Sequence, residues 1–139
     1  MKTGAIWMVL IGFLLAACSK SSSGPTSAEG SWTYTTADSK ISVTFQLVKN
    51  SSGSLEIQNQ TFKLNGTVYE SAAVISGIAL PAIASIKINA NDLKLTYPYY
   101  ILFTGVTVSS DFKKMNVPSG EYQTQSGTVS LTAVSITRP

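Results

Sequence analysis

A two-residue alternation of apolar and polar side chains runs through the chain from Gly30 to its end. It is cleanest at 41–47, where four large apolar residues alternate with Ser, Thr and Gln. Successive side chains of a β-strand point to opposite faces, so this period predicts strands buried on one side only. Shorter runs of the same kind recur along the chain, among them 32–34, 93–97 and 115–117.

Turn residues separate these runs. Asn65-Gly66 lies between two short runs, and Asn-Gly accepts the positive φ of a type I′ turn, so it predicts a tight hairpin. The apolar phase changes near Asn59-Gln60, where we expect a β-bulge or a break, and again between Leu131 and Val134, where we expect a β-bulge. Further turns are expected at 49–53, 109–111, 118–120 and 125–127.

Residues 72–84 are the hardest to assign, because they are mostly Ala, Ile, Val and Leu. A short helix across one end of the sheet would suit this composition. However, Gly77 and Pro81 argue against an uninterrupted helix, and Pro81 also argues against a central strand. Two short strands or an irregular crossing are therefore favoured.

About eight or nine short strands, with turns roughly every 8–12 residues, predict an all-β barrel or sandwich. Short connections favour pairing between strands that are neighbours in sequence, which makes the sheet a meander. Residues 30–139 are expected to form this all-β domain and to fold without the segment that precedes them.

Two positions at the ends of the domain narrow the choice of fold. Gly30-Ser31-Trp32 on the first strand and Arg138 after the last resemble the signature of the calycins, the group of lipocalins, fatty-acid-binding proteins and avidins. The resemblance implies that Trp32 plugs one end of a barrel and that Arg138 stacks on its indole face. The fold expected is a small lipocalin-like meander barrel of about eight strands, with an antiparallel β-sandwich as the alternative.

Residues 1–17 have the layout of a secretory signal peptide, with Lys2, an apolar run over 6–17 and two small residues before Cys18. The run is shorter than the roughly 18–20 residues of a membrane-spanning helix. Leu15-Ala16-Ala17-Cys18 resembles the lipobox of bacterial lipoproteins; a plain secretory signal is the alternative. The resemblance implies cleavage before Cys18, diacylglycerol on its sulfur and an acyl chain (palmitate) on its amino group, which together make a stable membrane anchor.

Residues 18–29 are expected to be the lipidated cysteine and a flexible linker, because Ser19 to Ala28 contain no large apolar side chain. Ser19, where some lipoproteins have Asp, resembles the signal that directs enteric lipoproteins to the outer membrane. The expected location is therefore the bacterial cell envelope, lipid-anchored in the outer membrane.

Composition excludes several functions. Charged residues make up 12% of the chain, and loss of Lys2 with the signal peptide leaves nine basic and seven acidic side chains, so there is no basis for nucleic-acid binding. The chain has no histidine and its single cysteine is Cys18, which excludes Ser-His-Asp triads, Cys–His pairs and imidazole metal sites. The acidic residues fall at turns or solvent-facing positions. We therefore expect no enzyme activity, no cofactor and no metal.

One aromatic cluster has a functional interpretation: Tyr97, Tyr99, Tyr100 and Phe103. Aromatic side chains offer apolar area, and the tyrosine hydroxyls can orient a ligand, although the favoured interpretation is that these residues fill the barrel wall with their hydroxyls reaching water. The function expected is a membrane-anchored, non-enzymatic, lipocalin-like β-domain that binds a small apolar ligand or an envelope partner protein; a ligand in the barrel would be uncharged or weakly polar. The alternative is a structural or accessory envelope lipoprotein without a ligand.

Overall fold

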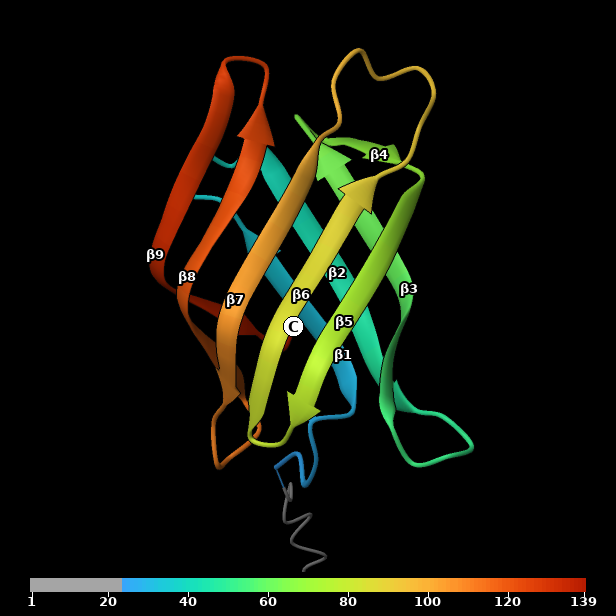
Figure 1. Cartoon of the computed structure of the whole chain (residues 1–139), viewed down its shortest axis with the longest axis vertical. Coiled ribbons are helices and arrows are strands. Elements are labelled where there is room, and N and C mark those ends of the chain that lie inside the picture. Colours follow the sequence, from blue (N-terminus) through green and yellow to red (C-terminus); the bar gives the residue numbers. More distant parts are fainter. Residues whose placement is uncertain (1–23) are drawn as a thin grey trace, which may run out of the picture.

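The computed structural model describes residues 24–139, so the signal peptide, the lipobox with Cys18 and the start of the linker lie outside the described residues. Within 24–139 the chain forms nine strands and no helix (Figure 1). The strands are β1 (Gly30–Thr35), β2 (Ile41–Lys49), β3 (Leu55–Leu64), β4 (Thr67–Tyr69), β5 (Ser71–Ala79), β6 (Ala82–Ala90), β7 (Tyr100–Val108), β8 (Lys114–Thr124) and β9 (Gly127–Thr137).

All nine strands belong to one antiparallel sheet in the order β4-β3-β2-β1-β9-β8-β7-β6-β5. Strands adjacent in this order are adjacent in sequence, except β1 and β9, whose contact at Thr33 and Thr137 joins the two ends of the meander. The sheet curls until β5 returns beside β3, where the Gln60 side chain donates a 2.9 Å hydrogen bond to the carbonyl of Ser71. The all-β meander barrel is therefore confirmed, and two packed sheets are not present in residues 24–139.

The core occupies the inside of the barrel, as the alternation along the strands requires. Every second residue of β2, from Ile41 to Leu47, is buried, while Ser42, Thr44 and Gln46 face outward and are only partly covered. The inward positions of the other long strands meet them. The largest fully buried side chains are Trp32, Phe45, Phe62, Phe103, Met115, Leu47 and the isoleucines 41, 83, 86, 88, 101 and 136.

The break expected at Asn59-Gln60 is confirmed as a β-bulge. Thr44 of β2 pairs with Thr61, but Gln46 pairs with Gln58, so β3 has one extra residue in this interval. Asn59 takes a positive φ of 49° there, and its side-chain amide donates a 2.7 Å hydrogen bond to Gln46. A bulge increases local twist, which helps the sheet to curl.

A bend crosses the five strands β5 to β9, on the side of the barrel opposite to the bulge in β3. The ladders between β5 and β9 are all interrupted along a line through Gly77, Ala84, Gly105, Pro118 and Ala133. One residue pair is missing from each ladder, except between β7 and β8, where two are missing. The φ angles of Gly77, Gly105 and Ala133 are positive (62°, 66° and 52°), and proline has no N–H for a ladder. Positive φ turns an extended chain, so the strands bend together along this line and curve the sheet.

The bend corrects two predictions. Residues 118–120 were expected to form a turn, but β8 continues through them as a bent strand from Lys114 to Thr124. A bulge was expected between Leu131 and Val134, but β9 keeps one register against β8. The change of apolar phase comes from the positive φ of Ala133, without an extra residue.

The structure confirms the assignment favoured for residues 72–84 and contradicts the strand expected at 93–97. The region that was hard to assign forms two strands, β5 and β6, joined at Leu80-Pro81, as favoured. The strand expected at 93–97 is absent; this stretch belongs to a loop, 91–99, at one end of the barrel. Asp92 starts a turn there by accepting hydrogen bonds from the N–H groups of Lys94 and Leu95.

Candidate functional site

The barrel is closed at the end where β1 begins. Trp32 is fully buried there, and its indole nitrogen donates a 2.9 Å hydrogen bond to the carbonyl of Ala28. The guanidinium carbon of Arg138 lies 4.6 Å from the centre of the Trp32 ring. Arg138 also donates to the carbonyl of Phe112 at 2.6 Å and to the carbonyl of Ser27. This is the arrangement that the calycin resemblance implies, and it seals this end of the barrel.

Packing at the closed end extends beyond the domain boundary expected at residue 30. Ala28 is 2% exposed, although the linker was expected to continue to residue 29. Gly30 has a φ of 123°, and a side chain there would collide with the guanidinium of Arg138. Burial also lowers the pKa of Arg138 below its ordinary value, but an arginine remains charged throughout the physiological range. Residues 27–29 are thus part of the plug.

The opposite end of the barrel contains a cavity of about 370 Å³. It lies among the β1–β2 turn, the β3–β4 turn, the 91–99 loop and the β8–β9 hairpin, which cluster at the top of Figure 1. Its apolar and aromatic lining consists of Ile41, Leu64, Leu95, Tyr69, Tyr99 and Tyr122. We call this cavity the mouth.

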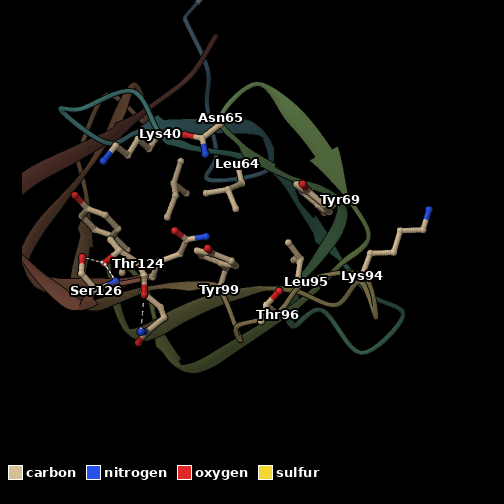
Figure 2. Close-up of a pocket in the computed structure, with 14 residues that line it drawn as sticks. Lys40, Leu64, Asn65, Tyr69, Lys94, Leu95, Thr96, Tyr99, Thr124 and Ser126 are labelled. Atoms are coloured by element: carbon tan, nitrogen blue, oxygen red, sulfur yellow. Dashed lines mark hydrogen bonds between the residues drawn. The ribbon is translucent and has the colours of Figure 1, made fainter.

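Neutral polar groups complete the lining of the mouth. They are the amides of Asn65, Gln123 and Gln125 and the hydroxyls of Thr96, Thr124 and Ser126. Two lysines, Lys40 and Lys94, also border the cavity, but Figure 2 shows both side chains directed away from its centre. The same view places Leu64 and Tyr99 near the middle, facing one another. The centre of the mouth is therefore uncharged, with aromatic and aliphatic side chains beside amide and hydroxyl groups.

A hydrogen-bonded carboxylate supports one wall of the mouth. Asp38 accepts hydrogen bonds from the buried Thr36 hydroxyl at 2.6 Å and from the N–H of Lys40 at 3.1 Å. These bonds, with that of Thr36 the stronger influence, hold the pKa of Asp38 below its ordinary value. Its other oxygen lies 3.5 Å from the Tyr122 hydroxyl and 3.9 Å from the Lys40 ammonium. Asp38 therefore stays ionised and positions Tyr122.

The phenols near this carboxylate stay neutral. Burial raises the pKa of Tyr122 above its ordinary value, and the negative charge of Asp38 raises it further. Burial likewise raises the pKa of Tyr34, which packs edge-on against Phe103 with 5.2 Å between ring centres. At physiological pH these tyrosines act as hydrogen-bonding groups and carry no charge.

The four aromatic residues singled out from the sequence do not form one site. Tyr99 lines the mouth and is 5% exposed. Tyr97 lies edge-on to Tyr99, with 6.5 Å between ring centres, and is 43% exposed at the rim. Phe103 is fully buried in the core, below the mouth. Only Tyr99 is therefore a lining residue, and Tyr97 is its neighbour.

Tyr100 faces the outside of the barrel. Its hydroxyl donates a 2.6 Å hydrogen bond to Glu121, and the Lys87 ammonium lies 4.6 Å from its ring centre. The bond to Glu121 raises the pKa of Tyr100 above its ordinary value. This trio joins β6, β7 and β8 on the outer wall, so Tyr100 contributes to the sheet and not to the mouth.

Sequence reasoning missed Tyr69, Leu95 and Tyr122, which come from β4, the 91–99 loop and β8. Tyr122 carries a signal, because it alternates with polar neighbours shortly before the turn at 125–127, and this places it near a barrel end. Leu95 was assigned to a strand that does not form. No local pattern brings Tyr69 to Tyr99, because their proximity depends on closure of the barrel.

No helix within 24–139 is both long enough and apolar enough to cross a membrane. In the same part of the chain, no three His, Cys, Asp or Glu side chains come together as a metal site would require. Comparison with protein-family models, with curated proteins and with solved structures finds no match to this chain.

Proposed function

We propose that the protein is a lipid-anchored lipoprotein of the bacterial outer membrane whose barrel binds a small uncharged molecule in the mouth. The observation that carries the binding function is the cavity of about 370 Å³ with three tyrosines in its wall. Its volume lies at the lower end of the roughly 300–1,000 Å³ typical of small-molecule sites. The lipobox at 15–18 carries the anchoring.

The place where the chain enters the barrel supports an orientation for this anchored domain. Ser27 and Ala28 are fixed at the closed end by Arg138 and Trp32. Only six residues, Cys18 to Ser23, precede the described chain after the predicted cleavage, and they span at most about 20 Å. A lipid on Cys18 therefore holds the closed end near the membrane, and the mouth opens away from it. A ligand would arrive from the aqueous side.

The lining supports an uncharged ligand. Tyrosine rings provide flat apolar area, and the surrounding amides and hydroxyls can bind neutral hydroxyl or carbonyl groups. A buried anion would meet no positive charge at the centre of the mouth, because both bordering lysines point away. A cation would meet only Asp38, which Thr36, Lys40 and Tyr122 already engage. Below the mouth, the barrel is filled by its own side chains, including Phe62 and Phe103, so a long acyl chain has no space to enter. Short neutral saccharides and small aromatic alcohols fit this chemistry.

No catalytic step belongs to this proposal. The chain has no histidine, and Asp38, the carboxylate beside the mouth, is engaged by Thr36, Lys40 and Tyr122. A second candidate is a structural or accessory lipoprotein without a ligand. The filled interior of the barrel favours that candidate, because a carrier of larger molecules needs a deep cavity.

Two adjacent tyrosines provide a matched test. Calorimetric titration of the purified protein with neutral saccharides, small aromatic alcohols and long-chain fatty acids should give saturable binding to one of the first two classes. Tyr99→Ala should weaken that binding about tenfold through lost aromatic contact, and Tyr69→Ala should do likewise. Tyr100→Ala removes the same side chain from the outer wall and should leave affinity unchanged. An equal effect of Tyr99→Ala and Tyr100→Ala would contradict binding in the mouth, and no binding at all would favour the accessory lipoprotein.

A further inference from the structure

The barrel is not fully closed between β3 and β5. β4 pairs with the upper end of β3 at Phe62 to Leu64. Below it, the side chains of Gln60 and Ser71 each donate a hydrogen bond to the backbone carbonyl of the other residue. No ladder connects β3 with β5 in the described chain. In Figure 1 the two strands separate toward the closed end of the barrel. We call this gap, between 55–59 of β3 and 73–79 of β5, the seam.

The inward side chains of β5 and of β3 across the seam are less deeply buried than those of β6. The inward side chains of β6, Ile83, Ile86 and Ile88, are fully buried. The inward side chains of β5, which include Ile75 and Ile78, are only partly buried and pack at the margin of the core. Ile57 of β3, across the seam, is also partly buried. The apolar inner face of the wall is therefore incompletely covered along the seam.

The edge of β5 lacks the features that usually protect a free strand edge. Proteins blunt such edges with charges, prolines or bulges. β3 has the bulge at Asn59, but β5 has neither a charged residue nor a proline from Ser71 to Ala79. Its outward residue Val74 is 59% exposed. From Ser71 to Ser76, before the bend at Gly77, β5 is therefore a regular uncharged strand edge, which is a template for pairing with another strand.

We propose that the seam accepts an extended segment of a partner protein as an added strand, paired with the free edge of β5. β3 and β5 are in contact at Gln60 and Ser71 and diverge toward the closed end, so the seam can take at most one added strand, and a second folded copy of the domain is disfavoured. The incoming segment would be uncharged where it lies beside Val74. It would place apolar side chains at alternate positions, where they cover Ile57 and Ile75. The proposal does not depend on the mouth or on the lipid anchor.

A copy of β6 is a suitable probe, because β6 already pairs with the other edge of the same strand. A fluorescent peptide with the sequence of Ala82–Ala90 should bind the full-length protein saturably, measured by fluorescence polarisation. The same peptide with proline at the positions of Ser85 and Lys87 should not bind, because it loses strand hydrogen bonds. Hydrogen exchange of the 72–76 amides that face the seam should be fast in the free protein and slow with the peptide.

Two equally exposed valines provide the control variants. Val74→Lys places a charge on the seam edge and should weaken peptide binding about fivefold. Val68 of β4 is 58% exposed but lies where β4 covers β3, so Val68→Lys should not change binding. The proposal is overturned if the peptide does not bind, or if all 72–76 amides are as protected as those of β2 in the free protein. If protection of the 72–76 amides rises with protein concentration and sedimentation shows a dimer, the edge of β5 pairs with a second copy of this chain, and the proposal is likewise overturned.

Discussion

At the scale of single residues, Arg138 both stacks on Trp32 and donates hydrogen bonds at the closed end of the barrel. It lies over Trp32 and ties two separate carbonyls, those of Phe112 and Ser27, to the end of the last strand. A planar guanidinium can lie flat on a ring while its N–H groups donate within its own plane, whereas an ammonium has no planar face to stack. The residue therefore joins the entry of the chain, the β7–β8 turn and the tryptophan plug.

We predict that Arg138→Ala lowers the free energy of unfolding by on the order of 1–2 kcal/mol, through lost stacking and two lost hydrogen bonds. Arg138→Lys, which keeps the charge but not the planar group, should lose almost as much. Urea unfolding of the chain without residues 1–17, followed by Trp32 fluorescence, measures both. An Arg138→Ala variant of unchanged stability, or a Trp32 freely quenched by iodide in the parent chain, would contradict the plug.

The raised pKa values of Tyr34 and Tyr122 predict alkaline behaviour. In the unfolded chain these phenols lose their protons near pH 10, their ordinary value, while in the folded barrel they hold them longer. The unfolded state then binds fewer protons, so stability is intact below about pH 10 and falls as the pH rises through the folded-state values. Tyr122→Phe should make this loss less steep, measured by thermal unfolding across the alkaline range. The same slope in both proteins would show that Tyr122 titrates as it does in the unfolded chain.

The types of residue in the sequence did not show which tyrosines line the mouth. Tyr99 and Tyr100 are adjacent and identical, yet one lines the mouth and the other faces outward beside Lys87. The alternation of a strand separates their two faces, but it does not say which face lies inside until the phase of β7 is fixed by Ile101 and Phe103. Trp32 and Arg138 were identifiable because a spaced motif at both ends of a domain carries long-range information.

At the scale of elements, alternation and turn chemistry were sufficient for the strands with one buried face. The Asn65-Gly66 hairpin and the bulge at Asn59 are where the sequence predicted them. The predicted elements were wrong where an apolar residue lies in a loop and where a proline lies inside a bent strand. Leu95 alternates as in a strand, but it lies in a loop and faces the mouth. Pro118 suggested a turn because proline usually ends strands, but here it occupies a bend that four other strands share.

The bend itself can be tested at one glycine. A Cβ on Gly105, at φ 66°, would lie 3.2 Å from Pro118 Cγ, whereas a Cβ on Gly53, at φ 83°, meets nothing within 4 Å. Gly53→Ala should therefore cost about 1 kcal/mol from backbone strain alone. Gly105→Ala should cost more, since crowding adds to the same strain. Equal losses in urea unfolding would mean that Pro118 gives way and that the bend is not tightly packed.

At the scale of the whole molecule, the barrel has two unlike ends and one incomplete side. The plug of Trp32 and Arg138 lies where the chain enters, the mouth lies at the far end, and the seam runs between β3 and β5 near the plug. This polarity gives an anchored domain a fixed direction, because the short segment before Gly24 limits how far the plug can move from a membrane. The proposed lipid on Cys18 is thus the premise from which the orientation of the mouth would follow.

The lipid anchor is also the most directly testable claim. The full-length protein, expressed in a bacterial host fed a labelled palmitate analogue, should take up the label and fractionate with the outer membrane. Cys18→Ser should take up no label and lose outer-membrane fractionation, because Cys18 is the only cysteine and the proposed acceptor of the lipid. Label on the Cys18→Ser variant, or an unlabelled parent protein free in the soluble fraction, would contradict the account.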